Sequence, residues 1–146
     1  MRLVDENLLD EWCRGHRAEA QSVVVELVWR LLRKSAPDAT RRRLPLGDSL
    51  NQPGADVYLE TVAACGPFVP CGKSYWEIGI GAKAGDKAQK DYRELTDSVA
   101  VEERRLSTFV FVTPLSGVRS REGLWVRMDG EQSLGRAHGL RPRPRV

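Results

Sequence analysis

The sequence Ser-Thr-Phe-Val-Phe-Val-Thr at residues 107–113 is the clearest strand signal in the chain. Its β-branched and aromatic residues favour extended structure, and the uninterrupted apolar run from Phe109 to Val112 indicates burial on both faces. A strand of this kind belongs inside a sheet that helices cover. The stretch therefore predicts an α/β fold with this strand near its centre.

Two further strands are predicted upstream of the central one. Residues 55–62 intersperse apolar with polar residues, and residues 75–80 alternate two sets of side chains, as a half-buried strand does. Residues 44–54 mix a short extended piece with turn formers, so two or three strands precede the next helix. The alternating sets of residues 75–80 are Tyr75, Glu77 and Gly79 on one face, and Trp76, Ile78 and Ile80 on the other.

Helices are predicted before and after these strands. Apolar residues recur at helical spacing through residues 8–32, which indicates two helices or one helix kinked at Gly15. This region is expected to end at residues 35–37, because proline disfavours helical geometry in the residue before it. A later helix is expected to run through Leu95 with Asp86 as its N-cap. The resulting order is helix, two or three strands, helix and strand.

The overall composition is that of an ordinary globular protein. The chain has 146 residues, which suits one domain. Its formal net charge is +3, from 23 basic and 20 acidic residues, an imbalance too small to identify a nucleic-acid-binding protein. Basic residues cluster at residues 41–43 and again in residues 136–146, and short runs of this kind most often lie on a solvated surface or in a tail.

Cysteine usage and hydropathy indicate a reducing compartment. The three cysteines are an odd number, and no charged-then-apolar leader precedes the first amphipathic segment, which disfavours secretion and a disulfide framework. The longest strongly apolar stretch, residues 22–32, contains Glu26 and Arg30 and is shorter than the roughly 20 apolar residues of a membrane span. We therefore expect a cytoplasmic protein with no membrane role.

Two acidic residues and a lysine form the strongest chemical candidate. Asp56 opens one predicted strand and Glu77 lies inside the next, so the carboxylates converge if these strands pair. Such oxygen ligands suit Mg²⁺, which can lower the pKa of a bound water and stabilise charge on a phosphate. Lys87, near the start of the following helix, is the natural cation for this site, with Lys83 and Lys90 as alternatives. The competing interpretation is a pair of surface carboxylates at strand ends.

Four segments of the sequence carry a family pattern. Together with the preceding helix, they resemble the PD-(D/E)XK nuclease domains found at the N-terminus of bacterial defence proteins that are similar to STAND or NLR NTPases. The resemblance covers residues 12–114. The segments are Gly-Asp-Ser-Leu-Asn-Gln-Pro-Gly-Ala-Asp (47–56), Pro-Phe-Val-Pro-Cys-Gly-Lys-Ser-Tyr-Trp-Glu-Ile-Gly-Ile-Gly (67–81), the helix with Lys87-Ala88 and Asp91-Tyr92, and Thr-Phe-Val-Phe-Val-Thr-Pro (108–114).

This resemblance implies a restriction-endonuclease-like core, a mixed β-sheet flanked by helices in the order αβββαβ. On this basis residues 1–15 form an N-terminal helix and residues 16–114 form the nuclease-like domain. Residues 115–146 form an atypical and partly disordered C-terminal segment. Within that segment a short strand is expected at residues 124–126, and residues 134–146 are expected to be a disordered tail.

The resemblance also implies a function. Asp56 and Glu77 match the acidic residues of the first and second motifs, the ligands of Mg²⁺ or Mn²⁺. With Lys87 they would form the catalytic residues of a metal-dependent endonuclease that hydrolyses phosphodiester bonds in DNA. The domain would then serve antiviral defence as an effector, alongside an NTPase or sensor module encoded in the same chain or nearby.

The chain departs from the family pattern at the usual lysine. Two residues after Glu77 the motif has lysine, whereas this chain has Gly79. Some related domains carry the lysine on the following helix, at the place of Lys87. Gln21, on an earlier helix, is a further candidate to approach the metal or phosphate. The alternative function is a catalytically inactive nucleic-acid-binding or interaction module of the same fold, or a truncated remnant.

Other kinds of site find little support in the sequence. The glycines at residues 79–85 satisfy neither GxGxxG nor GxxxxGK[ST], which disfavours a phosphate-binding loop. The cysteine and histidine spacings match no standard zinc pattern, so Cys13, Cys65 and Cys71 are expected to be buried small hydrophobes. Neither histidine has a recognisable nucleophile partner. The four tryptophans are expected to pack in the core.

Overall fold

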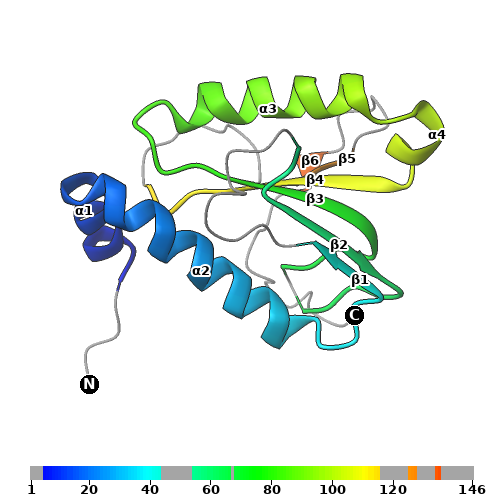
Figure 1. The fold of residues 1–146 in the computed structure, drawn as a ribbon, viewed down its shortest axis with the longest axis horizontal. Helices are drawn as coiled ribbons and strands as arrows, with labels where there is room; N and C mark the ends of the chain where they lie inside the picture. The colour runs from blue at the N-terminus through cyan, green and yellow to red at the C-terminus, as the bar shows by residue number, and fades with distance from the viewer. Residues whose placement is uncertain (1–4, 44–53, 67, 116–124, 128–133, 136–146) are drawn as a thin grey trace, which may run out of the picture.

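The fold of the chain is α/β, with a single mixed sheet between helices (Figure 1). The computed structural model describes residues 5–43, 54–66, 68–115, 125–127 and 134–135. The helices are α1 (Glu6–Gly15), α2 (Arg17–Ser35), α3 (Ala84–Ser98) and α4 (Val101–Arg104). The strands are β1 (Arg41–Arg43), β2 (Val57–Thr61), β3 (Gly72–Ile78), β4 (Ser107–Val112), β5 (Trp125–Arg127) and β6 (Leu134–Gly135).

The sheet follows the order of the strands along the chain, from β1 to β6. Neighbouring strands are antiparallel except β3 and β4, which are parallel. A parallel pair needs a crossover connection, and here α3 and α4 provide it. β3 and β4 therefore lie in the middle of the sheet, which confirms the central position that the apolar run at residues 109–112 predicts for β4.

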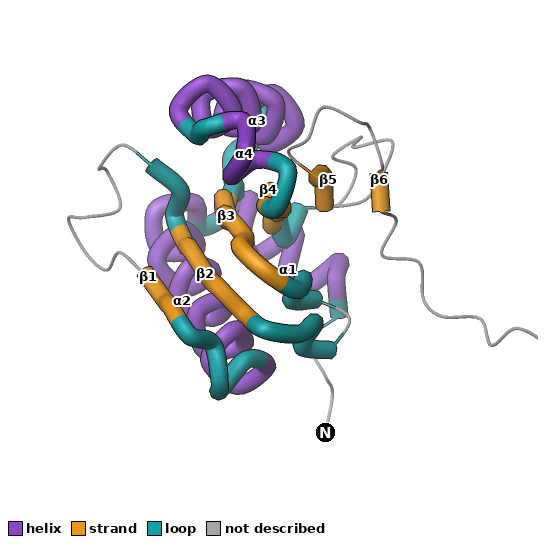
Figure 2. The backbone as a smooth tube through the Cα atoms, turned by 90° about the vertical axis from the view of Figure 1, so that its right-hand side faces the viewer, coloured by secondary structure: helices purple, strands orange, loops and turns teal. Residues whose placement is uncertain are grey.

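Helices α2 and α3 cover opposite faces of the sheet (Figure 2). On one face, Trp76, Ile78 and Val110 pack with the apolar side of α2. The other face, here called the α3 face, carries Tyr75, Phe109 and Phe111, which pack with Ala84 and Leu95 of α3. The predicted alternation of residues 75–80 is confirmed, since successive side chains of a strand point to opposite faces.

Burial of β3 differs from the sequence prediction. The alternation in residues 75–80 indicates a half-buried strand, yet every residue from Ser74 to Ile78 is buried. Packing of α3 over Tyr75 and its neighbours accounts for the difference, because the polar side of the strand faces this helix. The predicted burial of residues 109–112 on both faces is confirmed for residues 109–111, whereas Val112 is half-buried.

Two features of the helices test the sequence prediction. The N-terminal region forms two helices, and α2 ends at Ser35 just before Pro37, as predicted. The N-cap prediction for Asp86 is wrong, because α3 begins at Ala84 and Lys83 occupies the cap position. Asp86 lies instead in the first turn, where its negative charge stabilises the N-terminal end of the helix dipole.

The two ends of the sheet can be compared with expectation. The arginine run at residues 41–43 lies on the solvated surface, as expected, and it forms an exposed strand paired with β2. The strand expected at residues 124–126 lies at Trp125–Arg127. The disordered-tail prediction is wrong for Leu134–Gly135, which pairs with β5; residues 136–146 lie outside the described part of the chain. Among the described residues, no helix is both long and apolar enough to span a membrane.

Candidate functional site

Asp56 lies at the end of the β2–β3 ladder. The antiparallel register pairs Val57 with Trp76, so the next step of the ladder brings Asp56 opposite Glu77. The Asp56 Oδ2 atom accepts a hydrogen bond from the backbone N–H of Ile78 at 2.8 Å. This bond fixes the carboxylate against β3. The structure therefore brings Asp56 and Glu77 to one place, as their strand positions predict.

Glu77 is a buried carboxylate on the α3 face. Its exposed fraction is 8%, and it lies beside Phe111 in the parallel register of β3 and β4. Burial, and then the negative charge of Asp56, raise the pKa of Glu77 to about 8, although the Lys87 cation acts to lower it. Glu77 is thus a carboxylate that water solvates poorly. The alternative interpretation, a pair of surface carboxylates, is wrong for this residue.

Lys87 reaches the same place from the second turn of α3. Its Nζ atom donates to Glu77 Oε2 at 3.2 Å and to the carboxylate of Asp91 one turn later. Burial acts to lower the pKa of Lys87, but the hydrogen bond to Asp91 and the charge of Glu77 outweigh it and raise this pKa. Lys87 is therefore held as a cation between two carboxylates.

Asp91 is a residue of this site that the sequence analysis did not single out. Its carboxylate forms an ion pair with Lys87, and its side chain is 14% exposed. The signal was present, since residues four apart on a helix lie on the same side and an acid at this distance can pair with a lysine. Asp91 holds the lysine side chain in position from the helix side.

Gly79 occupies a position that has no room for a side chain. A Cβ atom on Gly79 would lie 2.4 Å from Phe111 Cζ. The Gly79 backbone N–H donates to the Val112 carbonyl at 3.0 Å, which holds this segment against β4. The Lys87 Nζ atom lies 6.0 Å from the centre of the Phe111 ring. Phe111 thus fills the space of a side chain at position 79, and the cation of the site comes from α3.

Replacing Gly79 with alanine is expected to destabilise the fold by about 1–3 kcal/mol, because the added methyl group overpacks the site against Phe111. Urea unfolding measures this loss. Gly81→Ala is the matched control, since no atom lies within 4 Å of a Cβ atom at that position. The double variant Gly79→Ala/Phe111→Leu, in which a smaller side chain replaces the ring, should recover part of the loss. Equal stabilities of Gly79→Ala and Gly81→Ala would contradict the steric explanation.

The other sequence candidates do not reach the site. Lys83 is exposed at the N-cap of α3, and Lys90 pairs with Glu94 at 3.6 Å with 72% of its side chain exposed. Gln21 is exposed on α2, the helix that covers the opposite face of the sheet from Glu77. Of the three predicted lysines, only Lys87 contacts a predicted acid. The prediction that Gln21 could approach the metal or phosphate is therefore wrong.

A pocket of about 610 Å³ lies near the start of β3, at the opposite end of that strand from Glu77. It contains none of the three predicted site residues. Charged, hydroxyl and apolar side chains line it together, so its walls define no single chemistry. The lining residues are Thr40, Glu60, Thr61, Val62, Cys71, Gly72, Lys73, Arg105, Leu106, Ser107 and Thr108.

The cysteines are divided between the core and the surface. Cys13 is fully buried in the core under α2, as predicted for a small hydrophobe. Cys65 is half-buried and packs against the same core. Cys71 is exposed at the pocket, so the prediction of burial is wrong for this residue. Trp76 is buried in the core as expected.

The donor set suits a hard divalent cation bound by few protein ligands. Within the described ranges, no group of three or more histidine, cysteine or acidic residues is placed to hold a metal ion. Mg²⁺ commonly uses only one or two carboxylates and completes its shell with water and phosphate oxygens. Asp56 and Glu77 supply two carboxylates. The Ile78 N–H binds the Oδ2 atom of Asp56, so Oδ1 is the Asp56 oxygen that would bind a metal ion.

Comparisons with known proteins identify no relative of this chain. No protein-family model matches the chain, and neither does any curated protein or solved structure with which it was compared. What the site can do therefore follows from its own residues.

Proposed function

We propose that the chain is a metal-dependent endonuclease-like domain of the PD-(D/E)XK kind, which hydrolyses phosphodiester bonds in DNA. One observation carries the proposal: Asp56 just before β2, Glu77 of β3 and Lys87 of α3 meet at one end of the buried strand β3. The order α2, β1, β2, β3, α3, β4 also supports it, because it is compatible with the αβββαβ order that the family resemblance implies once α1, the short helix α4 and the strands after β4 are left aside.

In this proposal Asp56 and Glu77 hold Mg²⁺ or Mn²⁺. The Asp56 carboxylate is oriented through its Oδ2 atom by the Ile78 N–H, and Glu77 is oriented by burial on β3. When bound, the ion would lower the pKa of a water molecule and stabilise the negative charge on the phosphate. The surrounding β3, β4 and α3 packing keeps both carboxylates in place before the substrate arrives, which removes a reorganisation cost from the reaction.

Lys87 acts as the cation beside the attacking water or the phosphate oxygens. It replaces the lysine that Gly79 cannot provide, since the Phe111 ring fills that space. Asp91 holds the other side of the ammonium group, so Lys87 would stay near the site if a metal ion took up the Glu77 carboxylate. Lys87 is the catalytic residue of this pair, and Asp91 is a positioning residue that acts through it.

The direct test is DNA cleavage by the purified chain. Supercoiled plasmid DNA is incubated with the protein in Mg²⁺, in Mn²⁺ and in EDTA, and nicked or linear products are measured on a gel. The proposal expects products with either divalent ion and none in EDTA. Binding of DNA without cleavage in any ion would instead favour the catalytically inactive module, which Gly79 in the usual lysine position suggests.

The same proposal gives the domain a biological setting. We place it in the cytoplasm of a bacterium as a defence effector, acting on DNA together with an NTPase or sensor module in the same chain or nearby. This setting rests on the sequence resemblance alone. Co-purification of the chain with an NTPase from its native cells tests it, and recovery of the chain without any such partner counts against it.

A further inference from the structure

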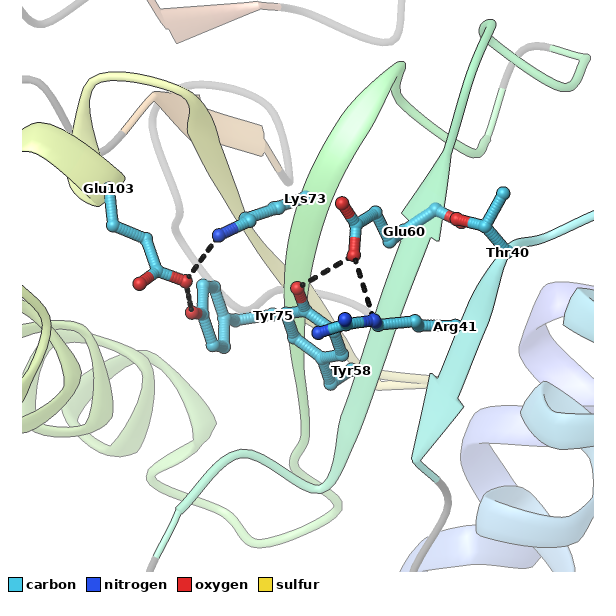
Figure 3. A network of polar contacts seen from close by, with 7 residues as sticks. All are labelled: Thr40, Arg41, Tyr58, Glu60, Lys73, Tyr75 and Glu103. Carbon is cyan, nitrogen blue, oxygen red and sulfur yellow. Dashed lines mark hydrogen bonds and ion pairs between the residues drawn. The ribbon is translucent and has the colours of Figure 1, made fainter.

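Two arginines of β1 lie on the same sheet face as the candidate site. The antiparallel register pairs Arg41 with Glu60 and Arg43 with Tyr58. Figure 3 shows Arg41 beside Glu60 and Tyr58, and Arg41 Nε lies 3.8 Å from Glu60 Oε2. The Tyr58 ring packs on Tyr75 with 5.1 Å between ring centres. Because Tyr75 belongs to the α3 face, this face continues across β2 to the arginines of β1.

Arg43 lies between Arg41 and the candidate site. A Cβ atom on Gly54 would be 3.2 Å from a terminal guanidinium nitrogen of Arg43, and Gly54 is two residues before Asp56. Arg41 and Arg43 are themselves two residues apart on one strand, so their Cα atoms are separated by about 7 Å. Arg41 and Arg43 therefore follow one another along β1 toward the end of β2 that Asp56 precedes.

Both arginines are accessible to a ligand. The Arg41 side chain is 78% exposed, and its contact with Glu60 is long for an ion pair. Arg43 is exposed, and no ion pair joins it to another residue in the part of the chain that the structure describes. In contrast, Lys73 on the same face is held by Glu103 at 3.0 Å.

Arg42, the middle residue of the run, has a different role. It faces the opposite side of the sheet, where its guanidinium donates to the carbonyl oxygens of Ala36 at 2.7 Å and of Pro37. These carbonyls follow the C-terminal end of α2, so Arg42 ties β1 to that helix. Arg41 and Arg43 thus lie on the α3 face, whereas Arg42 makes hydrogen bonds that hold the fold together.

We propose that Arg41 and Arg43 bind successive backbone phosphates of the DNA strand that enters the Asp56–Glu77 site. The inference rests on the proposed function and names the surface by which that site receives its substrate. Without a bound metal ion, the carboxylates of Asp56 and Asp91 outnumber the Lys87 cation that lies beside them, so the site repels a polyanion unless further cations lie next to it. Guanidinium groups bind phosphate oxygens in a bidentate manner, which favours arginine for this role.

Glu60 competes with DNA for this surface and should lower its affinity for a phosphate. Its carboxylate contacts Arg41 and lies 3.5 Å from the Tyr58 hydroxyl, so it competes with a phosphate for the same guanidinium. Glu60→Gln should therefore bind DNA more tightly than the wild-type chain, because the competing charge is removed while a hydrogen-bonding group stays. This opposite direction of change separates a local phosphate contact from a loss of folding.

The test measures DNA binding in EDTA, where no metal-dependent cleavage occurs. A fluorescein-labelled duplex of random sequence is titrated with protein at several salt concentrations, and fluorescence anisotropy gives the dissociation constants. Each phosphate contact contributes about 0.9 to the slope of log affinity against log salt concentration. Arg41→Gln and Arg43→Gln should each lower the slope by about that amount, and the double variant by about twice as much.

Arg42→Gln is the matched control, since it removes the same charge from the same strand on the other face. It should lower the melting temperature, through loss of the contacts with Ala36 and Pro37, but leave the salt slope unchanged. Equal slopes for the Arg42 and Arg43 variants would overturn the inference, as would a wild-type chain that fails to bind the duplex.

Cleavage separates this inference from the proposed function. If Mg²⁺-dependent cleavage occurs and the Arg41→Gln and Arg43→Gln variants keep the wild-type KM, the proposed function stands, and the proposal that these arginines bind the DNA is wrong. If no cleavage occurs but the salt slope falls as expected, the arginine surface stands in a domain that binds DNA without cutting it.

Discussion

Glu77→Gln and Asp56→Asn are each expected to lower the rate of Mg²⁺-dependent DNA cleavage by at least about 10²–10³-fold. Each change removes one charged ligand of the proposed metal ion and the stabilisation that the ion gives to charge on the phosphate. The amide side chains keep the size of the originals, and asparagine can still accept the hydrogen bond from the Ile78 N–H. Initial rates of plasmid nicking at saturating Mg²⁺ measure the loss.

Glu94→Gln is the control for this prediction, because Glu94 is an exposed acid of α3 that pairs with Lys90. It should cleave at the wild-type rate. Circular dichroism melting curves establish that the two site variants are folded. Cleavage that persists at the wild-type rate in both folded site variants would show that the two carboxylates take no part in the chemistry.

The metal-free protein should lose stability as the pH rises, and Glu77→Gln should remove that loss. The folded pKa of Glu77 is about 8, raised from an ordinary value near 4.5. A raised folded pKa means that Glu77 contributes stability below its ordinary pKa, and that this contribution disappears as the pH rises through 8. Between pH 5 and pH 9, the unfolding free energy of the variant should gain at least about 1 kcal/mol relative to the wild type.

Urea unfolding in EDTA at both pH values measures this change in the difference between the two proteins. The exchange of a carboxyl group for an amide adds an offset between them at every pH, so only the change with pH tests the prediction. A difference that stays constant from pH 5 to pH 9 would mean that Glu77 titrates alike in the folded and unfolded chains.

Lys87→Met is expected to lower the cleavage rate by about 10²-fold, which corresponds to about 2.7 kcal/mol of transition-state stabilisation. Methionine keeps an unbranched apolar side chain, one atom shorter than lysine, and removes the cation, whose Nζ atom lies 6.0 Å from the centre of the Phe111 ring. The loss should fall on kcat rather than KM if Lys87 stabilises charge that develops during the reaction. Single-turnover cleavage of a labelled oligonucleotide gives the rate of the chemical step.

Lys83→Met and Lys90→Met provide matched controls, since both lysines are exposed and neither contacts Glu77 or Asp56 among the described interactions. Each should retain the wild-type rate of the chemical step. Asp91→Asn should give a smaller loss than Lys87→Met, because it loosens the lysine without removing it. If Lys83→Met or Lys90→Met lowers the rate as much as Lys87→Met, the assignment of the catalytic lysine is wrong.

The contact between Gly79 and Phe111 offers a physical reason for the position of this lysine. A lysine at position 79 would begin with a Cβ atom in the space of the Phe111 ring. The ring also contributes to the core under α3, so it cannot move aside without opening a cavity. A cation for this site is therefore better supplied from α3, where Lys87 and Asp91 lie one turn apart.

Local sequence patterns predicted the secondary structure because each element buries its own periodic set of apolar residues. The alternation of residues 75–80, the apolar run at residues 109–112 and the helical spacing of residues 8–32 correspond to β3, β4 and the α1–α2 pair. Strand position also indicated that Asp56 and Glu77 would converge if the two strands paired, and the antiparallel pairing of β2 with β3 fulfils that condition.

What the tertiary structure alone decided is the environment of these residues. The burial of Glu77, its contact with Lys87, the Phe111 ring over Gly79 and the opposite orientations of Arg42 and Arg43 all depend on partners distant in sequence. Periodicity describes which side of an element a residue occupies, but not which element covers that side. Two acids and a lysine were recognisable in the sequence, whereas their electrostatic coupling depended on the packing of α3 against the sheet.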